Sequence, residues 1–539
     1  MRVKRLTGRR RRPDSAVAVT DFELASPGDA PLLDGAAYAE VCVRLHGAPL
    51  GVLQLAAEEC APHTIRRIAA ERFAARAQRL LARWNVGTDR GHAPDPVLEA
   101  LRARAAASDA PAVRGDPSRV TVVVCTRDRP QELARALARL VAAAEGAQLL
   151  VIDNSTDGSA AQVCARFPVR MVHEPRPGLD IARNRGIAES RTEVVAFTDD
   201  DALADAQWVG TVADAFARNP ELSALTGLVL PASLETEAQR RFEAYLGFAR
   251  GFERGWHHAP RASVEPIVAT HGNAGRLGTG ANMAFRRSAL LRVGGFDPAL
   301  DAGTAAAGAG DLELFFRVLK AGGLLVYEPM ALVRHMHRQE RAALDAQIES
   351  WGTGMGACLA SIARSFPEEA AGTRRLRRSL LMTWFARRWL DSLLSDRDRH
   401  ALVRREIAGL ARGAALYRGS LADDAGPRAF APLHRDPPAT QREAHVDVHA
   451  DRPLEALRHL DASRVRVRVQ LDGAPIGTVA LDVVDGSVGT DRLCDAIATA
   501  FTARFAGPLG LVQKRLSAVH ESSRSGHVRD AAGASVTSA

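Results

Sequence analysis

The chain has few cysteines, no paired metal-binding cysteines and no long apolar run. Its six cysteines, at positions 42, 60, 125, 164, 358 and 494 of 539, form no Cys-x-x-Cys pair. This scatter argues against a zinc module and against a disulfide framework, and it favours a reducing compartment. Because no stretch of about 18 uncharged apolar residues occurs, we expect a cytoplasmic protein that does not span a membrane.

Two further signals are missing. The basic N-terminal run MRVKRLTGRRRRP is not followed by an apolar segment, so we do not interpret it as a secretory signal. The glycine-rich stretch GTGANMAF lacks the Gly-Lys-Ser/Thr ending of a phosphate-binding P-loop.

The composition is globular, with 46% hydrophobic and 25% charged residues. The formal net charge of +8 suits phosphorylated ligands, anionic lipid or nucleic acid, and does not choose among them.

A short pattern occurs twice, near the two ends of the chain. VRLHGAPLGVLQL begins at Val43, and VQLDGAPIGTVAL begins at Val469. Each copy predicts two strands joined by a Gly-Ala-Pro turn, followed by a helix. Two copies so far apart do not form a solenoid. We therefore expect two small α+β modules, at 35–87 and 446–515, that flank a central domain and pack together, on a second copy or on a partner protein.

Apolar runs alternate with amphipathic segments from Arg119 onward. The runs RVTVVVC, QLLVID, VRMVHE and EVVAFT are typical of strands buried on both faces. The alternation predicts an α/β domain with a mostly parallel sheet and helices on both faces. Ligands of such sheets bind outside the carboxyl ends of the strands. The segments at these ends are CTRDRP, DNSTDGS, HEPRPG and TDDDA.

Composition suggests the remaining boundaries. We expect a basic flexible tail at 1–34, a linker at 88–118, the α/β domain at 119–342, a helical extension at 343–418, a linker at 419–445 and a disordered tail at 516–539.

Three consecutive aspartates, Asp199, Asp200 and Asp201, follow the run EVVAF. Mg²⁺ and Mn²⁺ are usually held by one or two carboxylates together with substrate phosphates. The triplet would equally suit the N-terminus of the helix that follows, where carboxylates are favoured. Taken alone, the triplet leaves both interpretations open.

Six segments, taken in order, resemble the family 2 glycosyltransferases of the GT-A fold, over about residues 120–340. They are VTVVVCTRDRP, LLVIDNSTDGS, RPGLDIARNRGIAES, VVAFTDDDA, and the later pair GTGANMAFRRSALLRVGGFDPAL and GAGDLELFFRVLKAGG. The resemblance implies a GT-A, Rossmann-like sheet and a nucleotide-diphosphate sugar as donor. It also implies Mn²⁺ or Mg²⁺ as cofactor, an acceptor hydroxyl on a glycan, a lipid-linked sugar or a small molecule, and no nucleic acid partner.

The resemblance also implies roles for residues on the donor side. Thr126 and Arg127 would line the pocket of the base, and Asp153 would accept a hydrogen bond from it. Arg183 would approach the base or the diphosphate, since a guanidinium suits phosphate oxygens. For each of these residues, local hydrogen bonding in a helix or turn is the alternative.

Metal roles follow from the same resemblance. Asp199 or Asp200 would hold the ribose side, and Asp201 would hold the metal that bridges the two phosphates. His335 would be an additional metal ligand. It alternates with His337 in RHMHR, so the two share a face if the segment is extended.

On the acceptor side, Gly280 and Asn282 would lie in the loop that faces the sugar and acceptor, and Asp311 would be the catalytic base. A carboxylate at hydrogen-bond distance can remove the proton of an attacking alcohol. The family usually has a glutamate directly before this aspartate, and here that position is Gly310. Glu313 points to another face of the helix and is a poor substitute. Asp311 would also suit an N-cap, and the two roles are compatible.

The stretch RRLRRSLLMTWFARRWLDSLL, at 374–394, is basic, helical and contains two tryptophans. Such a helix either lies on an anionic membrane surface, at the inner face of the membrane, or packs on the catalytic domain. We favour the packed helix.

Together these features predict a metal-dependent, inverting glycosyltransferase of the hexosyltransferase type. One alternative is a sugar nucleotidyltransferase, although CTRDRP is not a Lys/Arg-rich glycine loop. The other is a catalytically degenerate glycan-binding or assembly protein, for which Gly310 is the best argument.

Overall fold

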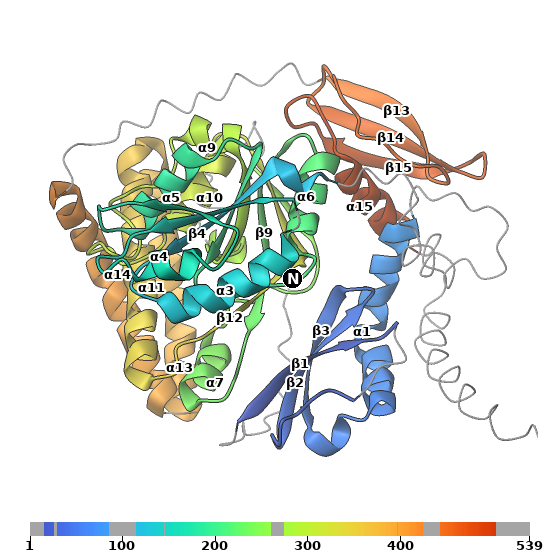
Figure 1. Cartoon of the computed structure of the whole chain (residues 1–539). Helices are drawn as coiled ribbons and strands as arrows, with labels where there is room; N and C mark the ends of the chain where they lie inside the picture. The colour runs from blue at the N-terminus through green and yellow to red at the C-terminus, as the bar shows by residue number, and fades with distance from the viewer. Residues whose placement is uncertain are drawn as a thin grey trace, which may run out of the picture.

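The computed structural model describes residues 16–25, 30–85, 115–144, 146–259, 274–395, 397–423 and 442–502. Figure 1 shows a central α/β body with long helices at one side and two small sheets with one helix each at the other. Within the described ranges, no helix has both the length and the apolar character needed to cross a membrane.

The central sheet has the strand order β10-β12-β9-β11-β7-β4-β5-β6, and β8 pairs with β12 beside it. The parallel strands β6, β5, β4 and β7 form one half, as the alternating pattern predicts. In the other half, β11 runs antiparallel to β7 and β9, while β9 and β12 are parallel to each other. The strand bounds are β4 Val120–Thr126, β5 Gln148–Asp153, β6 Arg170–His173, β7 Val194–Asp199, β8 Ala202–Ala204, β9 Leu222–Pro231, β10 Gly255–His258, β11 Asn282–Arg286 and β12 Leu324–His335.

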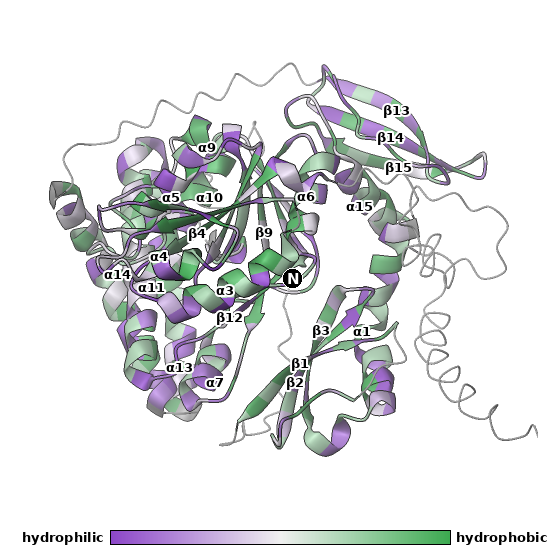
Figure 2. Cartoon of the chain, in the orientation of Figure 1, coloured by the Kyte–Doolittle hydropathy of each residue, from purple (hydrophilic) through white to green (hydrophobic). Residues whose placement is uncertain are grey.

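Helices cover both faces of this sheet. Val122 and Val124 of β4 belong to one apolar core and Val123 to the other, because successive side chains of a strand point to opposite faces. Figure 2 shows hydrophobic strands at the centre and helices of mixed hydropathy around them. The helix bounds are α3 Pro130–Ala143, α4 Ser159–Cys164, α5 Leu179–Glu189, α6 Trp208–Arg218, α7 Glu237–Tyr245, α9 Arg287–Val293 and α10 Gly310–Lys320.

The helical extension consists of α11 Arg341–Ser365, α12 Ala370–Ser379, the π-helical turn η5 Leu380–Phe385, α13 Ala386–Ser395 and α14 Arg397–Asp423. The two long helices α11 and α14 run side by side in the same direction, and α13 runs antiparallel to α14. A Cβ on Gly352 of α11 would overlap the carbonyl of Glu406 in α14, so the missing side chain allows the two helix backbones to approach closely. The extension reaches Asp423, beyond the predicted end at 418.

The two flanking modules share one topology. The first contains β1 Val17–Glu23, β2 Tyr38–Leu45, β3 Ala48–Ala56 and α1 Pro62–Asn85, and the second contains β13 Glu443–His449, β14 Arg464–Leu471, β15 Ala474–Asp482 and α15 Thr490–Ala500. In each, the first strand is parallel to the second, and the second is antiparallel to the third. The register shifts directly after Val43 in one hairpin and directly after Val469 in the other. The sequence repeat therefore corresponds to a repeat of backbone geometry.

Strand β1 corrects the prediction of a flexible tail over 1–34. It pairs with β2 along its length, from Val17 opposite Tyr38 to Glu23 opposite Arg44, and Phe22 is buried in the module core. The prediction is wrong for this stretch because a parallel partner strand is not marked by a local hairpin turn. The second module likewise begins at Glu443, before the predicted 446. Residues 1–15, 86–114, 424–441 and the predicted tail at 516–539 lie outside the described residues.

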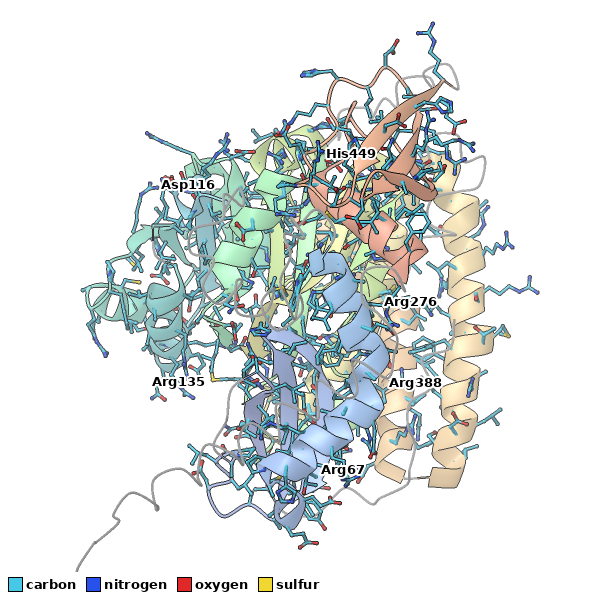
Figure 3. All side chains as sticks on the ribbon, turned by 90° about the vertical axis from the view of Figure 1, so that its right-hand side faces the viewer. Arg67, Asp116, Arg135, Arg276, Arg388 and His449 are labelled. Carbon is cyan, nitrogen blue, oxygen red and sulfur yellow. The ribbon has the colours of Figure 1, made fainter. Side chains whose placement is uncertain are left out.

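The modules contact each other through their helices. Ala82 of α1 is buried in the apolar core of the second module, and Arg83 forms an ion pair with Asp495 of α15. Figure 3, which faces the modules, shows α1 with its labelled Arg67 below the second module with its labelled His449. Asp495 also accepts a hydrogen bond from Trp256 of β10 at 2.8 Å, so the module pair is attached to one edge of the central sheet.

Candidate active site

The residues predicted to bind the nucleotide sugar and the metal ion meet at one edge of the sheet, where the strands have their carboxyl ends. Thr126 ends β4, Asp153 ends β5, Asp199 ends β7 and His335 ends β12. Parallel strands end at the same edge of a sheet, which is where α/β proteins bind ligands. Residues distant in the chain therefore converge as the sequence predicts.

The three aspartates of the triplet have different surroundings. Asp199, Asp201 and His335 each offer a ligand atom, and these atoms lie within 4.8 Å of one another. Asp200 points elsewhere, since its Oδ2 accepts a hydrogen bond from Thr126 Oγ1 at 2.8 Å and its Oδ1 lies 3.3 Å from Arg129 Nη1. The potential metal ligands are thus the first and third aspartates, and the second is engaged with the end of β4.

The potential ligand atoms of this cluster suit a divalent cation such as Mn²⁺. His335 Nε2 lies 3.1 Å from Asp201 Oδ1, close to the spacing of about 3 Å between adjacent ligands at bonds of about 2.1 Å. The strand pairing of His335 with Ala202 holds the two residues in this register. Two carboxylates and one imidazole leave room for donor phosphates to complete the coordination of the metal.

A chain of hydrogen bonds behind His335 fixes its tautomer. His337 Nε2 lies 2.8 Å from Glu243 Oε1, and His337 Nδ1 lies 3.3 Å from His335 Nδ1. A carboxylate only accepts, so Nε2 of His337 carries the proton and Nδ1 of neutral His337 accepts. His335 must then donate from Nδ1, which turns Nε2 toward Asp201. The sequence assigns no role to Glu243 or His337, because Glu243 lies on α7, far away in the chain from His337.

The protonation equilibria agree with this arrangement. Burial lowers the pKa of His337, and the hydrogen bond to Glu243 opposes that effect only in part. Burial also disfavours the charged form of His335, but the neighbouring Asp201 carboxylate outweighs it and raises the pKa of His335. Despite its burial, Asp201 has a pKa held well below its usual value by His335 and nearby arginines. A positive charge beside Asp201 is therefore strongly favoured, and a metal ion would supply one.

Arg129 and Arg338 contribute positive charge that the sequence analysis did not assign. Arg129 Nη1 lies 3.1 Å from Asp201 Oδ2, and Arg338 Nη1 lies 3.5 Å from the same oxygen. Both side chains are about one third exposed, so both reach the surface where an anionic ligand would arrive. Arg129 stands in CTRDRP, a motif singled out for Thr126 and Arg127 only.

Arg183 lies at the centre of a second cluster. Its Nη1 donates to Asp301 Oδ2 at 2.7 Å and to Asp180 Oδ1 at 3.0 Å, and its Nη2 lies 3.8 Å from Asp199 Oδ1. The guanidinium also lies over the Phe296 ring at 5.3 Å from its centroid. Arg183 is therefore held rigidly beside the metal-ligand cluster, where the resemblance implies that it meets the donor.

Asp311 lies next to Arg183, in the first turn of α10. Its Oδ2 accepts a hydrogen bond from Gly280 N at 2.6 Å, and its Oδ1 accepts one from Leu312 N at 2.8 Å. A Cβ on Gly280 would lie 2.7 Å from Arg183 Nη2 and 3.2 Å from Asp311 Oδ2, so only glycine fits between them. Burial and the nearby Asp301 carboxylate raise the pKa of Asp311 to about 6, against the opposing charge of Arg183. A pKa in this range suits a general base near neutral pH.

The position of Gly310 is filled by a carboxyl group from another helix. A Cβ on Gly310 would overlap Asp180 Oδ2. Asp180 is fully buried in the first turn of α5, and its Oδ2 has no hydrogen-bond partner among the described residues. Burial and the Asp301 carboxylate raise the pKa of Asp180 well above its usual value. Glu313 is not a substitute, because it is fully buried in a pair with Arg317.

The remaining predicted residues on the donor side have local partners. Asp153 is buried, and its Oδ1 accepts a hydrogen bond from Ser155 N at 2.9 Å. His173 lies 3.7 Å from the other oxygen of Asp153. Arg127 is partly exposed, and its Nε lies 3.6 Å from Asp128 Oδ2. All of them lie at the strand-end edge, and their role toward a base stays a prediction.

Asn282 corrects the prediction of an acceptor-facing loop residue. It is the first residue of β11 and is fully buried. Its Nδ2 donates to the carbonyls of Leu228 at 3.0 Å and Ala331 at 2.7 Å, and its Oδ1 accepts from Trp208 Nε1 at 2.8 Å. Because its polar groups are satisfied inside the protein, Asn282 links β11 to β9, β12 and helix α6 and offers nothing to a sugar.

The first flanking module supports the strands that carry the metal ligands. Arg44 Nη2 donates to Asp205 at 2.7 Å, directly after β8, and Arg44 Nε donates to Asp21 of β1 at 3.1 Å. Asp21 also accepts from Arg334 Nη2 at 2.8 Å. Arg334 is the neighbour of His335 in β12, so this network connects the module to both strands that position the cluster.

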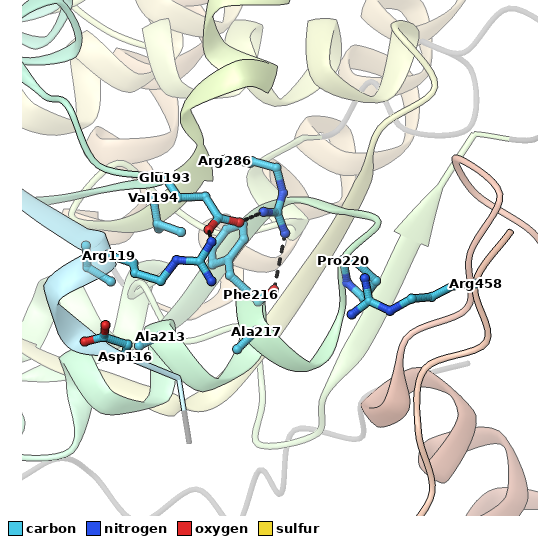
Figure 4. Close-up of a pocket in the computed structure, with 11 residues that line it drawn as sticks. Asp116, Arg119, Glu193, Val194, Ala213, Phe216, Ala217, Pro220, Arg286 and Arg458 are labelled. Atoms are coloured by element: carbon cyan, nitrogen blue, oxygen red, sulfur yellow. Dashed lines mark hydrogen bonds and ion pairs between the residues drawn. The ribbon is translucent and has the colours of Figure 1, made fainter. Parts of the chain in front are cut away.

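A pocket also occurs at the opposite end of β4 and β7 (Figure 4). Val120 and Val194, at the starts of these strands, line it together with Arg119, Glu193 and Arg286. Glu193 forms ion pairs with both arginines. The lining carries three arginines and two acidic residues, and the pocket is separate from the cluster at the strand ends.

Residues 121–293 match the model of the family described as Glycosyl transferase family 2. A pre-mycofactocin glycosyltransferase of Mycobacterium tuberculosis is 31% identical over 229 residues, which are 41% of this chain and 43% of the relative. A glucosyl-dolichyl phosphate glucuronosyltransferase of Haloferax volcanii is 24% identical over 237 residues, which are 42% of this chain and 72% of the relative. The chain thus spans less than half of the length of the first relative.

Among solved structures, a mannosyltransferase of Pyrobaculum calidifontis in complex with GDP-Man and Mn²⁺ matches with a TM-score of 0.38 and 18% identity. The match covers 65% of this chain and 98% of that one.

Proposed function

We propose that the chain is a metal-dependent, inverting glycosyltransferase, and the match of residues 121–293 to glycosyl transferase family 2 supports this. The donor is a nucleotide-diphosphate sugar, and the acceptor is a hydroxyl group. One observation carries the proposal: Arg183 Nη2 lies 3.8 Å from Asp199 of the candidate metal cluster, and the same nitrogen lies beside Gly280, whose N–H donates to Asp311. A site for the diphosphate and a site for a base are therefore adjacent.

Donor binding would use the positive and ligating groups at the strand ends. Asp199, Asp201 and His335 would hold Mn²⁺ or Mg²⁺, which neutralises the diphosphate and assists its departure. Arg129 and Arg183 are placed to meet phosphate oxygens, for which a guanidinium is well suited. Thr126, Arg127 and Asp153 would remain on the side of the base, as the family resemblance implies.

Asp311 would act as the general base. Its carboxylate accepts the proton of the acceptor hydroxyl while the hydroxyl oxygen forms a bond to the anomeric carbon. The bond between that carbon and the diphosphate oxygen breaks, and the nucleoside diphosphate leaves with the electron pair. A single displacement from the face opposite the leaving group inverts the anomeric configuration.

Neither alternative gains a specific observation. The segment after β4 contains no glycine-rich basic loop that would favour a nucleotidyltransferase. The degenerate alternative rests on Gly310, and Asp180 supplies a carboxyl group at that place from α5. The relatives are named for different acceptors, so they do not indicate one for this chain.

The variant Asp311→Asn tests the proposal. Transfer from a nucleotide sugar should fall by about 10²- to 10⁴-fold, which is the usual contribution of a general base. Donor binding should persist, measured as thermal stabilisation by a panel of nucleotide sugars with Mn²⁺, where a ligand at 100 times its Kd stabilises by about 2.7 kcal/mol. Asp157→Asn, at an exposed turn on the same edge, is the matched control. Unchanged turnover in Asp311→Asn would contradict the assignment.

A further inference from the structure

The segment from η5 through α13 concentrates exposed apolar side chains. Seven large hydrophobic residues are exposed in the described part of the chain, and four of them lie here: Met382 (68% exposed), Leu390 (62%), Leu393 (59%) and Trp384 (39%). Contiguous exposed apolar surface on a folded protein marks an interaction site more often than scattered apolar residues do. The other three, Leu32, Tyr38 and Leu291, lie on separate elements.

Exposed arginines adjoin these apolar side chains. Arg374, Arg375, Arg377 and Arg378 are exposed on α12, and Arg387 is exposed on α13. Asp391 is the one acidic residue of positions 374–393. This part of the surface therefore combines a strong local positive charge with apolar side chains.

The exposed residues share one side of the continuous helix. Arg378, Met382, Ala386, Leu390 and Leu393 follow one another at steps of three or four residues, and all are exposed. We define the α12–α13 outer face as Arg374, Arg375, Arg378, Met382, Leu390 and Leu393.

The opposite side of the same helix is packed against the protein. Leu380, Phe385, Arg388 and Ser392 are buried there. The packed helix that the sequence favours thus describes only this inner side. The apolar residues of the outer face are more than half exposed.

We propose that the α12–α13 outer face binds an anionic lipid membrane. Met382, Leu390 and Leu393 enter the boundary between headgroups and acyl chains, and the arginines contact lipid phosphates. An interfacial helix characteristically has aliphatic residues and tryptophan on one part and arginine on the other. Guanidinium groups bind phosphate oxygens in a bidentate manner, and basic clusters are attracted to anionic leaflets.

The inner side of the helix connects this face to the candidate active site. Arg388 donates to Glu406 at 3.0 Å and lies over the ring of Tyr245, 4.0 Å from its centroid. Tyr245 ends α7, the helix that carries Glu243, the partner of His337. Figure 1 shows α7 and α13 side by side. A membrane bound at the outer face would therefore lie against the same packed unit that supports the metal-ligand cluster.

Vesicle sedimentation with the full chain tests the proposal without donor or metal, so its result is independent of glycosyl transfer. The chain should sediment with vesicles of phosphatidylcholine and phosphatidylglycerol, and should stay in solution with phosphatidylcholine alone. Raised salt should weaken the binding, because screening reduces attraction to the surface. Leu390→Gln/Leu393→Gln should lower the partition coefficient by about tenfold or more, given the apolar area removed from the membrane. Arg374→Gln/Arg375→Gln/Arg378→Gln should abolish the preference for anionic vesicles.

Leu291→Gln is the matched control, because Leu291 is an exposed leucine of α9 (55%) that stands alone. It should bind vesicles like the wild type. All substituted residues are exposed, so circular dichroism melting curves should coincide. The proposal is overturned if the wild type does not bind anionic vesicles, or if Leu390→Gln/Leu393→Gln binds them as well as Leu291→Gln does. It is also overturned if light scattering shows a wild-type dimer that the leucine variant disrupts, since the face is then an interface between copies.

Discussion

The carboxyl group of Asp180 occupies the space that a side chain at position 310 would need. Asp180 stands in the first turn of α5 and Gly310 begins α10, and a Cβ on Gly310 would overlap Asp180 Oδ2. The two helix N-termini thus place Asp180 and Asp311 side by side around Arg183. The resemblance implies a glutamate at position 310, and in this chain a carboxyl group from α5 occupies that place.

Gly310→Ala should therefore be far more harmful than an ordinary alanine substitution. The new methyl group must displace Asp180 from Arg183, at a cost of about 1–3 kcal/mol in the free energy of unfolding, as expected for overpacking. The rate of glycosyl transfer should fall as well, because Arg183 and Asp311 no longer keep their positions relative to each other. Urea denaturation and turnover measure the two effects.

Gly308→Ala is the control for that experiment, since a Cβ there meets its nearest atom at 3.4 Å. Asp180→Ala/Gly310→Ala should recover much of the stability lost in Gly310→Ala, because the clash partner is gone. If the double variant is as unstable as the sum of both single variants, the two positions are not coupled in this way.

The rate of transfer should depend on pH through Asp311. Burial and Asp301 raise its pKa to about 6, and only the deprotonated form accepts a proton from the acceptor. Below that pH, kcat/KM should fall about tenfold per pH unit, and above it the profile should level off. Asp200, with a pKa raised to about 7 by burial and Asp201, is the competing source of this limb. If the fall of kcat/KM at low pH disappears in Asp200→Asn, that fall is due to the titration of Asp200 and not of Asp311.

Glu243 and His337 should govern the affinity for Mn²⁺ without touching the ion. Removing a group that orients a metal ligand typically lowers affinity by about 10- to 100-fold. We expect this loss in Glu243→Ala and in His337→Phe, measured by calorimetric titration of the free protein with Mn²⁺. Glu243→Gln should stay near wild type, because its amide oxygen still accepts from His337 Nε2. Equal affinity in all three variants would show that the tautomer of His335 is set in another way.

The first flanking module should contribute to the stability of the catalytic domain. Arg44→Met removes the hydrogen bonds to Asp21 and Asp205 and leaves a partly buried carboxylate without its partner, at a cost of about 1–3 kcal/mol. Arg67→Met removes an exposed helical pair with Glu71, which is worth at most about 0.5 kcal/mol. The difference in the free energy of unfolding between the two variants measures how much the Arg44 network contributes to stability. Equal values would mean that the module only adjoins the domain.

Much of the site could be predicted because it follows from local pattern. The apolar runs identify buried strands, and the polar residues directly after them must meet at one edge when the strands are parallel. Thr126, Asp153 and the aspartate triplet were located in this way. Within the triplet, the resemblance assigns the metal to Asp201 and the ribose to Asp199 or Asp200. The candidate metal cluster contains Asp201 and His335, as expected, together with Asp199.

The rest depended on contacts between segments far apart in the chain. Glu243 reaches His337 from α7, Asp180 reaches Gly310 from α5, and β1 pairs with β2 without a hairpin turn to mark it. Asn282 looked like a loop residue, and only the packing of three elements around it shows a structural role.

By itself, then, the amino-acid sequence determined the alternation of strands and helices, the repeat at the two ends and the edge of the sheet where the candidate active site lies. These follow from periodicity, turn residues and the direction of parallel strands, all of which are local. Only the tertiary structure decided which carboxylate faces which arginine and which nitrogen of His335 is turned toward Asp201. It also decided which side of α12–α13 remains exposed. Hydrogen bonds and burial are properties of atoms brought together by folding, and their partners are not neighbours in the chain.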